Sequence, residues 1–381
     1  MAKVSLKGGF IMVALLWSAM VGSILFLTPA LMLLLLPFDS ARVCYRQWSG
    51  FIAKMWFSFA TFLLEEVGGV EVVLSGDTLP FGEPAMIICN HRTRIDWMFM
   101  WSLCLRLGIL DSMKIVLKDS LKSIPGFGWA MQSFMFLFLA RDKSVDLQHM
   151  SDVLNYHVSN DMPLSLILFP EGTDLSRENM VKSDAFAAQN SLPRYKYVLH
   201  PKVVGWARSV ALLRGSCPAV YDVTIGYHDY VEGERPNEMS ILAGRLPKSV
   251  HLHVQRHPMP LLPEAPGQVE DWLKSSFARK EKRLLQFYTT GNKKFPELSN
   301  NPPSTNGRER EVDEWRKALV FWGLSSLFSI VCLSLVFGWF YCWLAALCWF
   351  LITKSGGAEV LELRLHGERG IYKKLLEDVA D

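Results

Sequence analysis

Two long uncharged stretches, one near each end of the chain, constrain its fold most. Gly8–Phe38 and Ala318–Thr353 contain no charged side chain over 31 and 36 residues respectively. As helices they would extend roughly 45 to 55 Å, whereas the hydrocarbon core of a bilayer is about 30 Å thick. Each stretch is therefore long enough for one tilted membrane span, or for one span and a partial return.

The first stretch also has features of a signal peptide, because Lys3 and Lys7 precede it. Its apolar part is about twice as long as the usual signal core, and Leu31–Leu36 offers no small-x-small cleavage site. We therefore predict a retained anchor. Phe51–Leu64 is apolar apart from Lys54, and it is typical of either an interfacial helix or the second arm of a hairpin. The predicted N-terminal membrane anchor covers residues 1–66.

The C-terminal stretch has Gly338 near its middle. It therefore favours a helical hairpin over residues 318–353, with a single long tilted helix as the alternative and a tail over residues 354–381. If both ends are hairpins, the rest of the chain lies on one face of the membrane, which we expect to be the cytosolic face. The sequence contains seven cysteines but no CxxC pair, and it has no Asn-x-Ser/Thr acceptor, which agrees with that face.

Charge excludes one class of partner. A net charge of +3 is too small to indicate nucleic acid, whereas a modest positive balance suits contact with anionic lipid. The sequence leaves open which protein partners the chain has.

Residues 67–290 have the pattern of apolar and polar residues that is typical of a globular α/β domain. Residues 291–317 are rich in Asn, Ser and Pro and predict a flexible linker. Short β-type runs alternate with helical patterns, among them Ser144–Ser159 and Arg177–Gln189. The β-type runs are Val70–Leu74, Ala85–Cys89, Phe134–Leu139, Leu164–Phe169, Ala219–Tyr227 and Ser249–Gln255. This pattern predicts a mixed, mostly parallel sheet with helices on both faces, anchored by N- and C-terminal membrane helices.

A polar segment, Asn90–Asp96, interrupts apolar sequence directly after one of these strands. Ligands bind such sheets where loops leave the carboxyl ends of strands. His91 and Asp96 are five residues apart across a turn into a helix. A neutral imidazole can accept an alcohol proton while a carboxylate fixes its tautomer. This spacing alone is weak, because Asp96 can equally serve the first turn of a helix.

Three other segments strengthen the catalytic interpretation. "FPEGTD", Phe169–Asp174, follows a buried strand and places Glu171 and Gly172 on a tight turn, although ordinary Pro-x-Gly turn chemistry also explains it. Lys118 follows a strand-like stretch, and Arg141 ends the run "FLFLAR". Cations at loop starts along one sheet edge can form an anion site.

Together these segments resemble the glycerophospholipid acyltransferase family, the group that contains lysophosphatidic acid acyltransferases. The family's four blocks are N-H-x-x-x-x-D, G-x-x-F-x-x-R, F-P-E-G-T and a proline-containing hydrophobic stretch. They correspond here, in the same order, to Asn90–Asp96, Met135–Arg141, Phe169–Thr173 and Val198–Val204. "NHRTRIDWMFMW", "GFGWAMQ" and "FPEGTDLS" are most similar to the lysocardiolipin acyltransferase branch.

The resemblance implies a glycerolipid acyltransferase-like fold and a reaction in which His91 deprotonates a lysophospholipid hydroxyl that attacks an acyl-CoA thioester, with Asp96 orienting His91. It implies that Asn90, Glu171, Gly172 and Thr173 belong to the substrate site, and that Lys118 and Arg141 bind phosphate. Acyl-CoA would be a co-substrate, with no bound cofactor and no metal. The expected location is the endoplasmic reticulum membrane, crossed more than once, with the catalytic domain facing the cytosol.

Two positions depart from the family pattern. The glycine that opens the second block is Met135, and the residue after E-G-T, often Arg in lysophosphatidic acid enzymes, is Asp174. Losing that cation disfavours a bare phosphomonoester and suits a larger phosphodiester headgroup, as in lysocardiolipin, lysophosphatidylinositol or lysophosphatidylglycerol.

Alternatives remain open at this point. Lysophosphatidic acid is one alternative acceptor, and CoA-independent transacylation between phospholipids is an alternative reaction. A third possibility is a lipid-binding protein without activity, which the three retained groups His91, Asp96 and Glu171 disfavour. His251 and His253 have metal-like spacing on a strand, but an exposed polar sheet edge is the favoured interpretation, since no Cys or carboxylate partner is evident nearby.

Overall fold

The structure is a computed structural model that describes residues 4–140, 142–229, 236–290, 293–295, 305–367 and 370–373. The chain divides into two compact units, each built from segments that are distant in sequence. The first unit comprises Met1–Met12, Thr61–Ile109 and Leu164–Arg310, and the second comprises Val13–Ala60, Leu110–Pro163 and Glu311–Asp381.

Five strands form the sheet of the first unit, in the order β1-β7-β6-β2-β5. Three of the four pairings are parallel, namely β1 with β7, β2 with β6 and β2 with β5, whereas β6 and β7 are antiparallel. The strands are β1 Glu71–Gly76, β2 Ala85–Cys89, β5 Ser165–Leu168, β6 Ala219–Tyr227 and β7 Ser249–Pro258. Every residue of β2, β5 and β6 is buried, which is why these strands are apolar over nearly their whole length.

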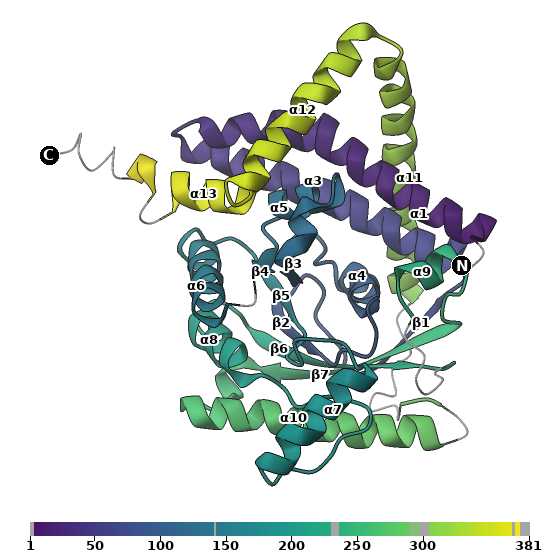
Figure 1. Ribbon diagram of the computed structural model, residues 1–381, viewed down its shortest axis with the longest axis vertical. Helices are drawn as coiled ribbons and strands as arrows, with labels where there is room; N and C mark the ends of the chain where they lie inside the picture. Colours follow the sequence, from purple (N-terminus) through teal and green to yellow (C-terminus); the bar gives the residue numbers. More distant parts are fainter. Residues whose placement is uncertain are drawn as a thin grey trace, which may run out of the picture. The chain divides into compact units, whose positions relative to one another are not determined.

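Helices cover both faces of this sheet (Figure 1). Side chains alternate between the two faces along β6, and those on each face contact a different helix. On one face, Asp222 forms an ion pair with Lys280 of α10 and Thr224 accepts a hydrogen bond from Arg283 of the same helix. On the other face, Tyr227 packs against Phe99 of α4 with ring centroids 6.0 Å apart. The helices of this unit include α4 Asp96–Leu107, α7 Arg177–Gln189, α8 Val203–Leu213, α9 Glu238–Leu242 and α10 Pro266–Thr289.

The second unit contains a parallel pair of strands, β3 Met113–Lys118 and β4 Leu137–Leu139. Aromatic side chains dominate its interior. Phe57 stacks on Phe136 with centroids 6.0 Å apart, and Trp129 stacks on Trp349 at 5.8 Å. Its helices include α5 Phe127–Ser133, α6 Lys143–Ser159, α12 Val336–Lys354 and α13 Ala358–His366.

Within the described residues, three helical segments are long and apolar enough to cross a membrane: Leu6–Leu35, Gly307–Leu333 and Val336–Lys354. The first combines α1 Leu6–Val21 and α2 Thr28–Ala30 with a π-helical turn at Gly22–Leu27 and a 3₁₀ turn at Leu31–Leu35. α3 Asp39–Phe62 follows it, and α11 Thr305–Leu333 precedes α12 and begins inside the predicted linker. The remaining short turns are Leu63–Val67, Asp119–Ser123 and Met259–Leu261.

The predicted fold class is confirmed: the sheet is mixed and mostly parallel, with helices on both faces and apolar helices towards both ends. Two expectations need correction. The run Phe134–Leu139 forms a strand only from Leu137, because Met135 adopts a left-handed φ of 56° and Phe134 caps α5. His251 and His253 are not on an exposed edge, since β7 lies between β1 and β6 and both side chains are buried.

Candidate active site

His91 and Asp96 meet in the loop between β2 and α4, within the first unit. His91 Nδ1 lies 2.9 Å from Asp96 Oδ2. Asp96 is the first residue of α4 and is fully buried, whereas the His91 side chain retains 18% of its exposure. An imidazole that donates Nδ1–H to a carboxylate carries its lone pair on Nε2. The loop thus supplies an accessible base with a fixed tautomer.

Three further donors hold the Asp96 carboxylate. The backbone N–H of Thr93 donates to Oδ2 at 2.8 Å, and the Thr93 hydroxyl donates to Oδ1 at 2.8 Å. The Tyr227 hydroxyl also donates to Oδ1. Burial raises the pKa of Tyr227, so its phenol stays protonated and able to donate. With both oxygens occupied, the carboxylate cannot rotate away from His91 without losing hydrogen bonds.

Asn90 fixes the start of this loop to the neighbouring strand. Its side-chain amide accepts from Ile225 N at 2.8 Å and donates to Ile225 O at 3.2 Å. The amide therefore occupies the place of a further peptide group in the β2–β6 ladder, which ends at the pair Cys89–Val223. Asn90 is fully buried, and its side chain holds the start of the catalytic loop against the backbone of β6.

Glu171 connects the loop that follows β5 to the catalytic loop. Its Oε1 accepts from His91 N at 2.9 Å, and its Oε2 accepts from Leu199 N at 3.0 Å. Burial raises the pKa of the Glu171 carboxyl, while the two N–H donors act in the opposite direction. Because the side chain is 2% exposed, its visible effect is to hold two backbone segments together.

The other residues of this turn have local partners. Gly172 has a φ of +70°, and a Cβ there would lie 2.9 Å from Lys202 Nζ, so conformation and space both favour glycine. Thr173 Oγ1 accepts from Asn179 Nδ2 at 2.9 Å. Asp174 is 9% exposed, and its backbone carbonyl accepts from the same amide at 3.0 Å. The turn and the start of α7 thus form one hydrogen-bonded structure.

The structure brings Asn90, His91, Asp96 and Glu171 together, with Gly172 and Thr173 in the adjoining turn. The two predicted phosphate ligands, Lys118 and Arg141, are not among the residues that the structure brings together here. Lys118 is the last residue of β3, belongs to the second unit and is exposed. Arg141 lies outside the described residues.

His251 and His253 of β7 have hydroxyl partners close by. His253 Nδ1 lies 3.1 Å from Ser75 Oγ, and His251 Nε2 lies 3.2 Å from Ser249 Oγ. Across the described part of the chain, no group of three or more His, Cys, Asp or Glu side chains is arranged to hold a metal ion.

Sequence reasoning missed Tyr227, Thr93 and Phe169 as parts of the site. The Phe169 ring lies against the His91 ring with centroids 4.6 Å apart. Tyr227 is the last residue of β6, which runs parallel to β2 and extends beyond it. A polar side chain at the carboxyl end of the neighbouring parallel strand was a signal that could have identified Tyr227.

Comparisons with known proteins place the chain among acyltransferases. A family model described as "Acyltransferase" matches residues 71–227, and one described as "Acyltransferase C-terminus" matches residues 240–322. The chain is 36% identical to lysocardiolipin acyltransferase 1 of Gallus gallus over 95% of both chains. It is 32% identical to lysophosphatidylinositol acyltransferase 10 of Caenorhabditis elegans, over 83% of this chain and 84% of that protein.

Among solved structures, the 1-acyl-sn-glycerophosphate acyltransferase PlsC of Thermotoga maritima is similar to the chain at 17% sequence identity. That match has a TM-score of 0.44 and covers 74% of this chain and 96% of that one.

Proposed function

This chain belongs to the glycerophospholipid acyltransferase family, and we propose that it transfers an acyl group from acyl-CoA to the free hydroxyl of a lysophospholipid. The observation that carries the proposal is the hydrogen bond between His91 Nδ1 and Asp96 Oδ2 at 2.9 Å. It leaves Nε2 as the basic nitrogen of a partly exposed ring.

The reaction proceeds by direct transfer. His91 Nε2 removes the proton of the acceptor hydroxyl as its oxygen attacks the thioester carbonyl carbon. The carbon–sulfur bond breaks, and the CoA thiolate takes the proton from the imidazolium to leave as the thiol. Asp96 stabilises the imidazolium between these two proton transfers. The sequence has no G-x-S-x-G nucleophile elbow, which suits a path without an acyl-enzyme.

The acceptor we propose is a lysophospholipid with a large headgroup: lysocardiolipin, lysophosphatidylinositol or lysophosphatidylglycerol. Two relatives are named for the first two of these lipids. Asp174, where lysophosphatidic acid enzymes often carry Arg, supports the choice, because a carboxyl group beside the E-G-T turn would repel a dianionic phosphomonoester.

Acyl-CoA as donor, and phospholipid remodelling at the endoplasmic reticulum membrane with the catalytic unit on the cytosolic side, are parts of the same proposal. Three candidate membrane spans support an enzyme embedded beside its lipid acceptor. Lys118 and Arg141 remain the proposed phosphate-binding cations, and the chemistry calls for no metal and no bound cofactor.

The test compares membranes that contain the wild-type chain with membranes that contain His91→Ala. Each is incubated with labelled acyl-CoA and a panel of lysophospholipids, and with labelled phospholipid in the absence of acyl-CoA. We expect acyl-CoA-dependent transfer by the wild type and loss of about a hundredfold or more in the variant, because general-base catalysis contributes about that much.

Protein abundance, measured by immunoblot, controls for folding of the variant. Substantial turnover by well-expressed His91→Ala would remove His91 as the base. Transfer that proceeds equally well without acyl-CoA would favour the transacylase instead, and equal rates on lysophosphatidic acid would remove the argument from Asp174.

A further inference from the structure

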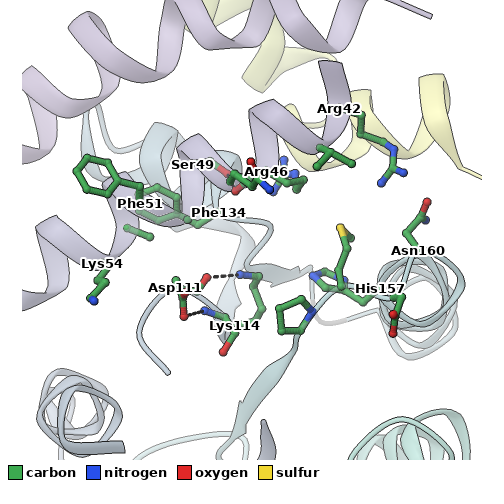
Figure 2. Close-up of a pocket in the computed structure, with 18 residues that line it drawn as sticks. Arg42, Arg46, Ser49, Phe51, Lys54, Asp111, Lys114, Phe134, His157 and Asn160 are labelled. Carbon is green, nitrogen blue, oxygen red and sulfur yellow. Dashed lines mark hydrogen bonds between the residues drawn. The ribbon is translucent and has the colours of Figure 1, made fainter. Parts of the chain in front are cut away.

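A cavity of about 510 Å³ lies inside the second unit, at the amino end of β3 (Figure 2). α3 forms one wall, and the segments Asp111–Lys114 and His157–Pro163 form the others. Lys114 is near the amino end of β3, whereas the proposed substrate-binding Lys118 is at the strand's carboxyl end. The cavity is therefore a different place from the predicted phosphate site on the same strand.

Cationic side chains lie within this cavity, and acidic groups lie at its rim. Arg42 and Lys114 are each 7% exposed, and the Arg46 side chain is 13% exposed. Asp111 and Asp161, the acidic residues among those that line the cavity, are both exposed. Figure 2 shows Arg42 and Arg46 entering from α3 and Lys114 from the opposite wall.

The carboxylate closest to these cations is already occupied. Glu362 of α13 forms an ion pair with Arg46 and accepts a hydrogen bond from Tyr156 Oη at 2.8 Å. Arg46 also donates to Ser133 O at 2.9 Å. Its ion pair with Glu362 offsets its charge, so the other two cations are the less compensated ones.

Arg42 and Lys114 have weaker partners still. Arg42 is 3.4 Å from Asp39, whose side chain is 89% exposed. The Lys114 ammonium is 3.5 Å from Asp111 O and 3.4 Å from Met113 O, and it forms no ion pair with any described residue. A buried cation without a carboxylate is unfavourable. Burial, together with the charge of Arg46, lowers the pKa of Lys114 to about 7.

The remaining wall is mixed. It includes the apolar side chains Phe51, Phe134 and Met162 beside polar ones such as Gln47 and Asn160. A volume of about 510 Å³ falls in the range of sites that hold an organic molecule and exceeds what a small inorganic ion needs. Basic groups beside aromatic and aliphatic groups match an amphiphile with a phosphate group.

We propose that this cavity binds the phosphate group of an anionic amphiphile, with Lys114 and Arg42 as its donors. Phosphate accepts charge-assisted hydrogen bonds from both. Binding would supply counter-charge to these two cations. None of the lining residues belongs to the loops that carry His91 and Glu171, so the cavity adds a second ligand site to the proposed acyltransferase.

The experiment measures access to Lys114 in the purified full-length chain. The protein is placed in nanodiscs of phosphatidylcholine alone, of phosphatidylcholine with phosphatidylglycerol, and of phosphatidylcholine with added inorganic phosphate. Brief acetylation near pH 8 is followed by mass spectrometry of Lys114 and of Lys182, an exposed lysine of α7. We expect anionic lipid to reduce labelling of Lys114 by about tenfold at roughly ten times the dissociation constant, with Lys182 unchanged.

The three conditions distinguish the sources of phosphate. Protection by phosphatidylglycerol alone assigns the site to a lipid headgroup, and protection by inorganic phosphate as well shows that the phosphate group suffices. Equal labelling of Lys114 in all three conditions would overturn the proposal.

Two variants test the donors. Lys114→Met retains the bulk of the side chain without its charge, and Lys182→Met is the matched control. We expect affinity for phosphatidylglycerol, measured in both variants as the lipid content that raises the unfolding temperature, to fall by about tenfold or more in the first variant, since a hydrogen bond to a charged group is lost. No change in the second is expected. Unchanged affinity in Lys114→Met would remove Lys114 from the site.

Discussion

Tyr227 donates its hydroxyl hydrogen to Asp96, the same carboxylate that accepts from the His91 ring. The pair joins the last residue of β6 to the first residue of α4. Both side chains are buried. Tyr227 therefore acts on catalysis through Asp96, as a positioning residue, because its hydroxyl is bound to the carboxylate.

Tyr227→Phe removes this hydrogen bond and keeps the ring that packs on Phe99. We expect kcat to fall about five- to twentyfold, the effect of about 1–2 kcal/mol, while KM for acyl-CoA is unchanged. The less stabilised carboxylate would bind the imidazolium more strongly, so the acidic limb of the pH–rate profile should move to higher pH. Steady-state kinetics across pH measure both effects. A purely structural role would lower protein abundance and leave the profile in place.

Glu171→Gln tests the bridge between the two loops. The carboxylate accepts from His91 N and from Leu199 N, whereas an amide offers one oxygen and turns an NH₂ group towards the other donor. We expect a loss of about 1–3 kcal/mol in the free energy of unfolding, from one unsatisfied buried N–H, and a lower kcat.

Thermal unfolding and acyl transfer, each measured on purified protein, check this prediction. Glu178→Gln on α7 is the control, because Glu178 is exposed and should behave as wild type. Equal stability of Glu171→Gln and wild type would show that the bridge contributes little.

Much of the site was predictable because its chemistry is local in sequence. His91 and Asp96 meet across five residues of one loop, and β2, β6 and α7 begin and end where their apolar runs and turn signals indicate. Parallel strands bring their carboxyl ends to one edge, so the loop with Glu171 could be placed beside His91 before any coordinates.

The parts that escaped prediction depend on packing between distant segments. Tyr227 is separated from Asp96 by 131 positions. A local sequence pattern does not predict which strand ends next to the loop that carries Asp96. The apolar run Phe134–Leu139 predicts a strand throughout, but the turn after α5 forces Met135 into the left-handed region. The cavity beside Lys114 joins α3, β3 and α6, and its lining residues are not contiguous in any motif.

Met135 occupies a position where the family pattern has glycine, and its φ of 56° gives the reason. A non-glycine residue in the left-handed region is strained by about 1–2 kcal/mol, and the Met135 side chain, which is fully buried, offsets that strain by packing. Met135→Gly should therefore destabilise the protein, since removing a buried Met side chain costs about 2–5 kcal/mol.

Met135→Ala is the informative comparison. Alanine loses nearly the same packing and keeps the strain, so Met135→Gly should be the more stable of the two by about 1 kcal/mol, the reverse of the usual order. Chemical unfolding of both variants in the same detergent measures the difference. A more stable alanine variant would show that the backbone at this position is not strained.

Lys114 makes stability depend on pH in a direction that follows from its lowered pKa of about 7. Between about pH 7 and pH 10, the unfolded chain binds more protons at this residue than the folded chain does. The stability of the fold therefore decreases as pH falls through this range. Arg46, Asp111, Glu362 and His157 surround Lys114; burial lowers the pKa of His157 to about 3, so it stays neutral throughout.

Lys114→Met removes this dependence. Between about pH 9 and pH 7, the wild type should lose about 1–2 kcal/mol of stability relative to the variant, measured as the difference between their unfolding curves in phosphatidylcholine nanodiscs. Glu359, whose pKa burial raises to about 7, titrates in both proteins and cancels in that difference. A bound phosphate would reduce the effect by favouring protonated Lys114, so added phosphatidylglycerol should make the two pH profiles more alike. Parallel profiles without any anion would contradict a buried, unpaired ammonium at this position.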